Sequence, residues 1–139
     1  MLSFTKLLDL VGGGVEDAAA DTIDACVGDT VVEATIIDNA LRLELASGRT
    51  LIIRDSGQSC CETRYMSTDD DLASVRGGKL LSVSVRDGGG AGGDAWGDHD
   101  VQFLKITTNV GEITVVNHNE HNGYYGGFVI SATLVNHLG

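Results

Sequence analysis

Residues 31–54 have the sequence VVEATIIDNALRLELASGRTLIIR, in which three short apolar runs are separated by two pairs of turn-forming residues. Between Leu41 and Leu45 every second residue is leucine, which is the period of a strand with one buried face. The pairs between the runs, Asp38-Asn39 and Ser47-Gly48, contain residues that tolerate a positive φ. We therefore expect an antiparallel meander of three strands, Val31–Ile37, Leu41–Leu45 and Thr50–Arg54.

The rest of the chain indicates further strands, over residues 81–85, 101–107, 113–118 and 128–135. Two segments that precede the meander, Phe4–Val11 and Val15–Val27, have apolar residues at helical spacing instead. The fold class predicted is α+β and mainly β. Its architecture is expected to be an antiparallel meander sheet or flattened barrel of six to seven strands, with one or two N-terminal helices.

The length of 139 residues predicts a single domain, 1–139. Within it, residues 1–28 are expected to be a helical N-terminal segment and residues 29–135 a β-meander domain. Residues 87–100, DGGGAGGDAWGDHD, connect two of the predicted strands. Because glycine loses the most conformational freedom on ordering, this composition predicts a flexible loop over 87–100.

Acidic residues outnumber basic ones by 20 to 9, and the formal charge is -11. Since phosphate binding needs clustered Lys and Arg, this charge argues against direct binding to nucleic acid. No run approaches the roughly 20 apolar residues of a membrane helix, so no membrane association is expected. Three cysteines are too few and too unevenly spaced for a secreted disulfide framework, which favours a cytoplasmic location.

A first polar cluster follows the meander, over residues 57–71. If Cys60–Met66 is extended, neighbouring side chains point to opposite faces, and Glu62 and Arg64 share one of them. These two side chains are then placed to form an ion pair or to point together into a cleft. The same face would carry Cys60 and Met66, whereas the opposite face would carry Cys61.

A second polar cluster, NHNEHNGYYGGF over residues 117–128, is expected in a connection between two strands. It combines two imidazoles, a carboxylate, three amides and two phenols. Loops that are held by a rigid sheet often carry function, so we expect a functional site here. Asn122-Gly123 is also a turn signal, and the two tyrosines could equally bridge core and surface.

A binding site without bond-making chemistry can be built from both clusters. Arg64 and Arg76 could hold an anionic group, while Tyr124 or Tyr125 could stack on a base and the asparagines could hydrogen-bond to its polar edges. The residues predicted to bind a ligand are Glu62, Arg64, Arg76, His118, Asn119, Glu120, His121, Asn122, Tyr124 and Tyr125. No cofactor and no catalytic residue is assigned.

Enzymatic alternatives use partly the same residues. Cys60 or Cys61, together with His118 or His121, could bind a metal ion or form a thiol–imidazole pair, with Glu120 as a further ligand or base. The spacing is not that of a known metal or nucleophile motif, and adjacent cysteines on a strand point apart. A small metal- or thiol-dependent hydrolase is therefore the alternative to a binding protein.

The order of the two motifs resembles a family of uncharacterised bacteriophage and bacterial proteins recorded as a domain of unknown function. The residues that carry the resemblance are Cys60-Cys61-Glu62 and Asn122-Gly123-Tyr124-Tyr125, in a matching region of roughly 29–132. The resemblance implies a mainly-β domain and a phage or prophage setting, hence a host-cell cytoplasm. It implies no established activity, so no catalytic role is carried over.

The sequence favours a non-enzymatic phage or prophage accessory protein that binds a small molecule or a host protein. A host signalling nucleotide is one ligand of that kind, and the resemblance makes the protein a candidate against host defence. An acidic mimic of a partner or of nucleic acid is a third hypothesis, since an acidic surface suits a basic partner. A strand-rich domain with exposed edges also makes a homodimer or higher homo-oligomer plausible.

Overall fold

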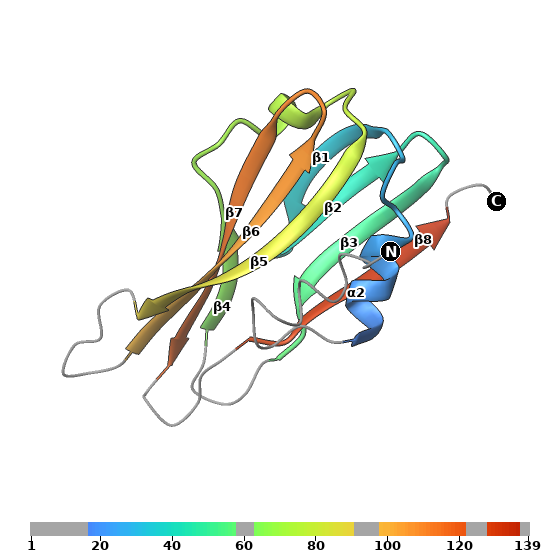
Figure 1. Cartoon of the computed structure of the whole chain (residues 1–139). Helices are drawn as coiled ribbons and strands as arrows, with labels where there is room; N and C mark the ends of the chain where they lie inside the picture. The colour runs from blue at the N-terminus through green and yellow to red at the C-terminus, as the bar shows by residue number, and fades with distance from the viewer. Residues whose placement is uncertain (1–16, 58–62, 91–97, 122–127, 137–139) are drawn as a thin grey trace.

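The protein is a mainly-β molecule in which eight strands of the described part form two antiparallel sheets, as the computed structural model in Figure 1 shows. The structure describes residues 17–57, 63–90, 98–121 and 128–136. Its elements are α2 (Asp17–Asp24), β1 (Val31–Ile37), β2 (Ala40–Leu45), β3 (Arg49–Asp55), β4 (Thr63–Ser67), the 3-10 helix η1 (Leu72–Val75), β5 (Leu80–Gly90), β6 (Asp98–Thr108), β7 (Glu112–His121) and β8 (Ile130–Asn136).

The predicted meander forms as expected. β1, β2 and β3 pair antiparallel in sequence order, with Ile36 opposite Leu41 and Leu41 opposite Ile53. Asp38 and Asn39 both have positive φ, 53° and 59°, which is the backbone of a tight turn between twisted strands. Short polar residues reach this region at the lowest steric cost after glycine, and their presence explains why the chain reverses at this point.

The strands form two sheets rather than one continuous sheet because β4, β5, β6 and β7 pair with one another and not with the meander. The first sheet has the order β1-β2-β3-β8, and the second has the order β4-β7-β6-β5. The prediction of a mainly-β antiparallel fold is confirmed. The strands do not close into a barrel, and the described part has eight of them where six to seven were expected, because the segment after the meander also forms a strand, β4. β8 returns from the far end of the sequence to pair with β3 over its whole length, from Arg49 opposite Asn136 to Asp55 opposite Ile130.

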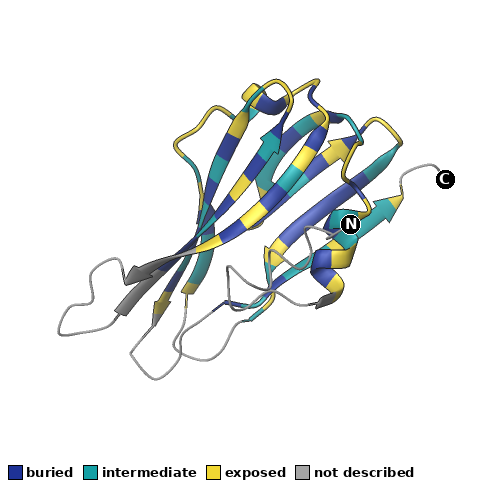
Figure 2. Ribbon diagram, viewed as in Figure 1, coloured by how far each residue is buried: buried dark blue, intermediate teal, exposed yellow. Residues whose placement is uncertain are grey.

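The hydrophobic core lies between the two sheets and draws on the inward face of each strand (Figure 2). Leu43 and Leu51 belong to the first sheet, and Leu104 and Ile113 to the second; all four are fully buried. α2 packs against β8 and contributes Ile23 to the core, while the predicted helix over 4–11 lies outside the described residues. In the described part, no helix has the length and apolarity needed to cross a membrane.

Three strands extend further than the sequence indicated. The predicted loop over 87–100 begins and ends as strand, because β5 continues to Gly90 and β6 starts at Asp98, with residues 91–97 outside the described part. β7 likewise continues to His121, so residues 117–121 are strand and not connection. In both places pairing with a neighbouring strand extends the ladder, for example Gly90 with Asp100 and Asn119 with Arg64, which outweighs the low strand propensity of these residues.

Candidate functional site

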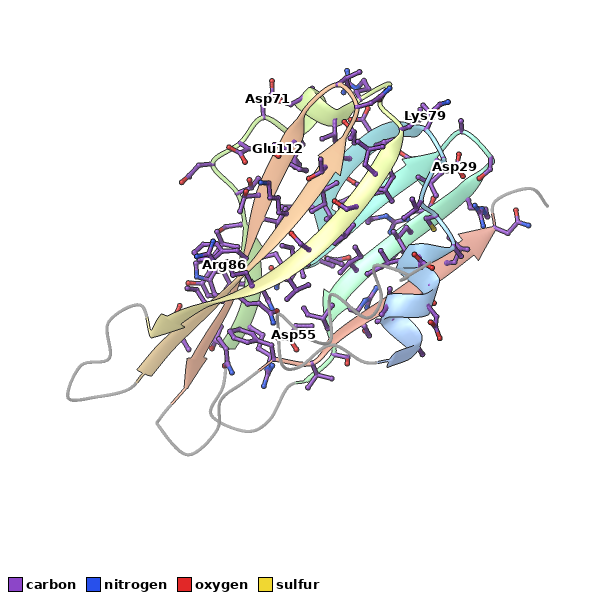
Figure 3. The ribbon with its side chains drawn as sticks, in the orientation of Figure 1. Asp29, Asp55, Asp71, Lys79, Arg86 and Glu112 are labelled. Atoms are coloured by element: carbon purple, nitrogen blue, oxygen red, sulfur yellow. The ribbon has the colours of Figure 1, made fainter. Side chains whose placement is uncertain are left out.

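A buried ion pair lies between the two sheets at the end of β3. The side chains of Asp55 and Arg64 are only 3% and 7% exposed, and one guanidinium nitrogen of Arg64 is 2.8 Å from each carboxylate oxygen. Figure 3 labels Asp55 at this end of the molecule. Arg64 therefore lies on the inward face of β4 and shares it with Met66, as the alternation predicted. Its described partner is Asp55, which was not among the predicted site residues.

Asp55 also accepts three further hydrogen bonds. The backbone N–H groups of Gly57 and Val129 donate to one oxygen at 3.0 and 3.1 Å, and the Asn117 amide donates to the other at 3.0 Å. A carboxylate buried this far costs several kcal/mol unless its charge is paired and its lone pairs are used. Here both conditions are met, so the carboxylate can remain buried and tie four parts of the chain together.

Gly57 packs directly over this ion pair. A Cβ atom at this position would lie 2.9 Å from Val129 Cγ2 and 3.1 Å from Arg64 Cζ, both shorter than ordinary contacts. The absence of a side chain at Gly57 therefore lets the backbone approach the guanidinium group closely.

Three amide side chains continue the polar interior along the inward faces of β6 and β7. Gln102, Asn117 and Asn119 are each at most 1% exposed, and Gln102 pairs across the strands with Asn117. Buried amides normally have all their hydrogen-bonding atoms engaged. The Oδ1 atom of Asn117, however, accepts no hydrogen bond from the residues that the structure describes. A polar group with a donor would complete this part of the interior.

The flanks of the two sequence motifs meet at this end. Residues 58–62 connect β3 to β4, and residues 122–127 connect β7 to β8 through Phe128 and Val129. β3 pairs with β8 through Asp55 and Ile130, and β4 pairs with β7 through Thr63 and Glu120. The segment with the Cys-Cys-Glu motif therefore leads from β3 to β4, and the segment with the Asn-Gly-Tyr-Tyr motif leads from β7 to β8. Each strand that flanks one segment is paired with a strand that flanks the other.

β7 divides the predicted second cluster between two faces. Asn117 and Asn119 point into the sandwich, whereas His118 and Glu120 lie on the outer face next to β4. There the His118 ring stacks on Tyr65, with centroids 4.3 Å apart, and His118 Nε2 lies 2.8 Å from the Ser67 hydroxyl. The Tyr65 hydroxyl donates to Glu120 at 2.6 Å. The outer-face contacts join the edge strand β4 to β7 and are separate from the buried polar interior.

The pKa of Tyr65 is raised. The largest cause is the hydrogen bond to Glu120, and burial of the phenol and the negative charge of Glu120 also contribute. We expect the substitution Glu120→Gln to lower this pKa toward the ordinary value of about 10. Because the folded-state pKa is raised, the contact stabilises the fold below the pKa of an unfolded tyrosine and loses this effect as pH rises through the raised value. Tyrosinate absorbance during an alkaline titration, with Tyr65→Phe subtracted, measures the shift; an unchanged pKa in Glu120→Gln would contradict it.

The remaining predicted site residues are not brought together with Arg64 in the described part. Arg76 follows η1 near the opposite end of the sandwich and bonds to Glu33 of β1 at 2.8 and 3.0 Å. It therefore cannot hold an anion jointly with Arg64. His121 belongs to β7, but its side chain is not among those described. The residues Glu62, Asn122, Tyr124 and Tyr125 lie outside the described residues.

The enzymatic alternative remains a prediction for the same reason, since Cys60 and Cys61 lie outside the described residues. Among the side chains that are described, no group of three or more His, Cys, Asp or Glu could hold a metal ion. Cys26 is buried in the core, and burial raises the pKa of its thiol, which disfavours the reactive thiolate.

Asp55, Gln102 and Asn117 were not among the predicted site residues, although the sequence contains a signal for each of them. Each continues the inward positions of its strand: Asp55 follows Leu51 and Ile53, and Gln102 precedes Leu104. A polar residue in phase with buried apolar ones is the pattern of a polar group that faces the core. Strand phase, extended past the apolar run, would have selected all three residues.

The molecule is a sandwich of two four-stranded antiparallel sheets with a polar interior at one end. The model of a family described as a domain of unknown function, DUF7448, matches residues 24–130. Since the match covers most of the chain, the protein belongs to this family. No curated protein and no solved structure was found to match the chain.

Proposed function

We propose that the protein binds a small polar molecule at the end of the sandwich where the two motif segments attach, without catalysing a reaction. The observation that carries this proposal is the hydrogen bonding of Asp55, which holds the flanks of both segments, at Gly57 and Val129, against one buried carboxylate. Such preorganisation lowers the entropic cost of ordering a binding site. The family resemblance extends the proposal to a phage or prophage accessory protein in the cytoplasm of its host.

The polar interior favours a ligand with uncharged hydrogen-bonding groups. The charge of Arg64 is already neutralised by Asp55, and Arg76 lies elsewhere, so the two cations suggested by the sequence are not free to hold a phosphate together at this end. Amide side chains, in contrast, pair with matched donors and acceptors such as those on the edge of a nucleobase. The ligand class proposed is therefore a molecule with a base-like or amide-like polar edge.

Native mass spectrometry of the full chain, freshly purified from cells, tests this proposal. The wild-type chain is expected to retain a small-molecule mass that is released on denaturation. Tyr124→Ala, in the second motif, is expected to lose it. Val110→Ala provides the control, because Val110 is exposed in the β6–β7 turn at the opposite end, and this variant should retain the same mass.

Several results would contradict the proposal. If Tyr124→Ala retains the same mass as wild type, the ligand does not bind at this end of the sandwich. A retained zinc mass would favour the hydrolase, and a retained protein mass would favour a host-protein partner. A bare wild-type chain whose thermal midpoint is not raised by millimolar nucleosides or nucleotides would overturn the binding of a base-like ligand.

A further inference from the structure

A hollow of about 450 Å³ lies on the outer face of the second sheet. Strands β5, β6 and β7 line it, because their outward side chains stand side by side across the ladder. Ser84 pairs with Lys105 and Lys105 with Thr114, and in the adjacent row Arg86 pairs with Phe103. The residues that line the hollow are Ser84, Arg86, Phe103, Lys105, Glu112 and Thr114.

The charges in this hollow do not cancel. Lys105 is bound to Glu112 at 3.3 Å, so their charges offset each other. Arg86 is exposed, and no carboxylate among the described residues forms an ion pair with it. Figure 3 labels Arg86 on β5 and Glu112 on β7. The lining therefore carries one net positive charge, on the surface of a chain whose net charge is -11.

An aromatic residue, Phe103, is the cross-strand neighbour of this unpaired arginine. Phe103 is half-buried on β6, between Arg86 of β5 and Val116 of β7 in the cross-strand register. Its ring adds an apolar surface to the lining of the hollow, and Ser84 and Thr114 add hydroxyl donors. A cation, two hydroxyls and a flat apolar surface are complementary to an amphipathic anion with a flat body.

We propose that this hollow binds a monocarboxylate with an aromatic or otherwise flat apolar body. The single net charge matches one negative charge, and the planar guanidinium group of Arg86 matches the planar carboxylate with two parallel donors. A doubly charged phosphate would be left with an uncompensated charge in an acidic protein. The carboxylate can belong to a small aromatic acid or to the C-terminus of a peptide, because both present the same chemistry.

Amide NMR spectra of the full chain, titrated with matched probes, test the proposal. Phenylacetate is expected to shift resonances of β5, β6 and β7 with an affinity at least roughly tenfold above that of phenylacetamide, which has the same shape without the charge. Acetate, which lacks the ring, should also bind more weakly. Equal binding of phenylacetate and phenylacetamide, or no shift on these strands, would overturn the proposal.

Two arginine variants locate the site. Arg86→Gln is expected to abolish the preference for phenylacetate over phenylacetamide, and its unchanged amide spectrum outside β5–β7 would show that the fold is intact. Arg42→Gln changes an arginine on β2, in the other sheet, and should keep the preference. A preference that survives in Arg86→Gln would overturn the assignment.

N-acetylphenylalanine distinguishes the two sources of the carboxylate. Tighter binding than that of phenylacetate supports the C-terminus of a peptide, and weaker binding supports a free aromatic acid.

Discussion

Replacing Asp55 by alanine is expected to destabilise the fold by about 3–5 kcal/mol, the cost of removing one partner of a buried ion pair. The substitution leaves the Arg64 guanidinium group buried without this carboxylate, and it removes the acceptor for the N–H groups of Gly57 and Val129. Each of these donors would need a new partner or water. Urea unfolding followed by circular dichroism measures the loss of stability.

The exposed ion pair of the same molecule is the control for this experiment. Glu33 and Arg76 are bonded at 2.8 Å, the same length as the buried pair, but their side chains are 35% and 54% exposed. Because water and salt screen such pairs, Glu33→Ala is expected to leave the urea midpoint almost unchanged. Equal losses in Asp55→Ala and Glu33→Ala would show that burial does not govern the contribution of the Asp55 carboxylate.

The core substitution Leu104→Ala is expected to lower the free energy of unfolding by about 2.7–5 kcal/mol. Leu104 is fully buried on the interior strand β6, where it lies between Val85 and Val115 in the cross-strand register. Truncation removes buried methyl groups and leaves a cavity. Because β6 is hydrogen-bonded to β5 on one side and to β7 on the other, the strands cannot readily move to close it. The free energy of unfolding, measured in urea, gives the size of the effect.

Leu81→Ala provides the matched control, because it makes the same chemical change on the neighbouring strand β5. Leu81 is 50% exposed, so less apolar surface is lost and no closed cavity forms. We expect a loss of less than about 1 kcal/mol. If Leu81→Ala were as destabilising as Leu104→Ala, the Leu81 side chain would have to be buried in solution, which would contradict the prediction.

Local patterns were sufficient to predict the meander and the position of most other strands. The alternation of leucines over 41–45 and the turn residues Asp38 and Asn39 specify the first hairpin, because strand period and positive φ are properties of neighbouring residues. The same alternation indicated that Arg64 and Met66 share one face of an extended segment, and in the structure both side chains are oriented inward. These predictions need no information about distant parts of the chain.

The candidate site could be predicted only in part. Sequence analysis selected Arg64 and Asn119 but paired the arginine with Glu62, two residues away. The described partner is Asp55, nine residues earlier and on the other sheet. It also grouped His118 with Asn119 as one cluster, whereas the continuation of β7 places them on opposite faces. The position at which a strand ends depends on its pairing with neighbouring strands, and this pairing cannot be inferred from local composition.

The sequence by itself determined the mainly-β class, the meander of β1–β3 and the buried face of β2, because each follows from residues within a few positions of one another. Only the tertiary structure decided that β8 pairs with β3 and that β4 pairs with β7, since loop closure allows many such pairings and packing selects one. That selection brings the flanks of two distant motifs to Asp55. A buried carboxylate is stable only where its hydrogen-bond donors converge, and this convergence is a property of the folded chain.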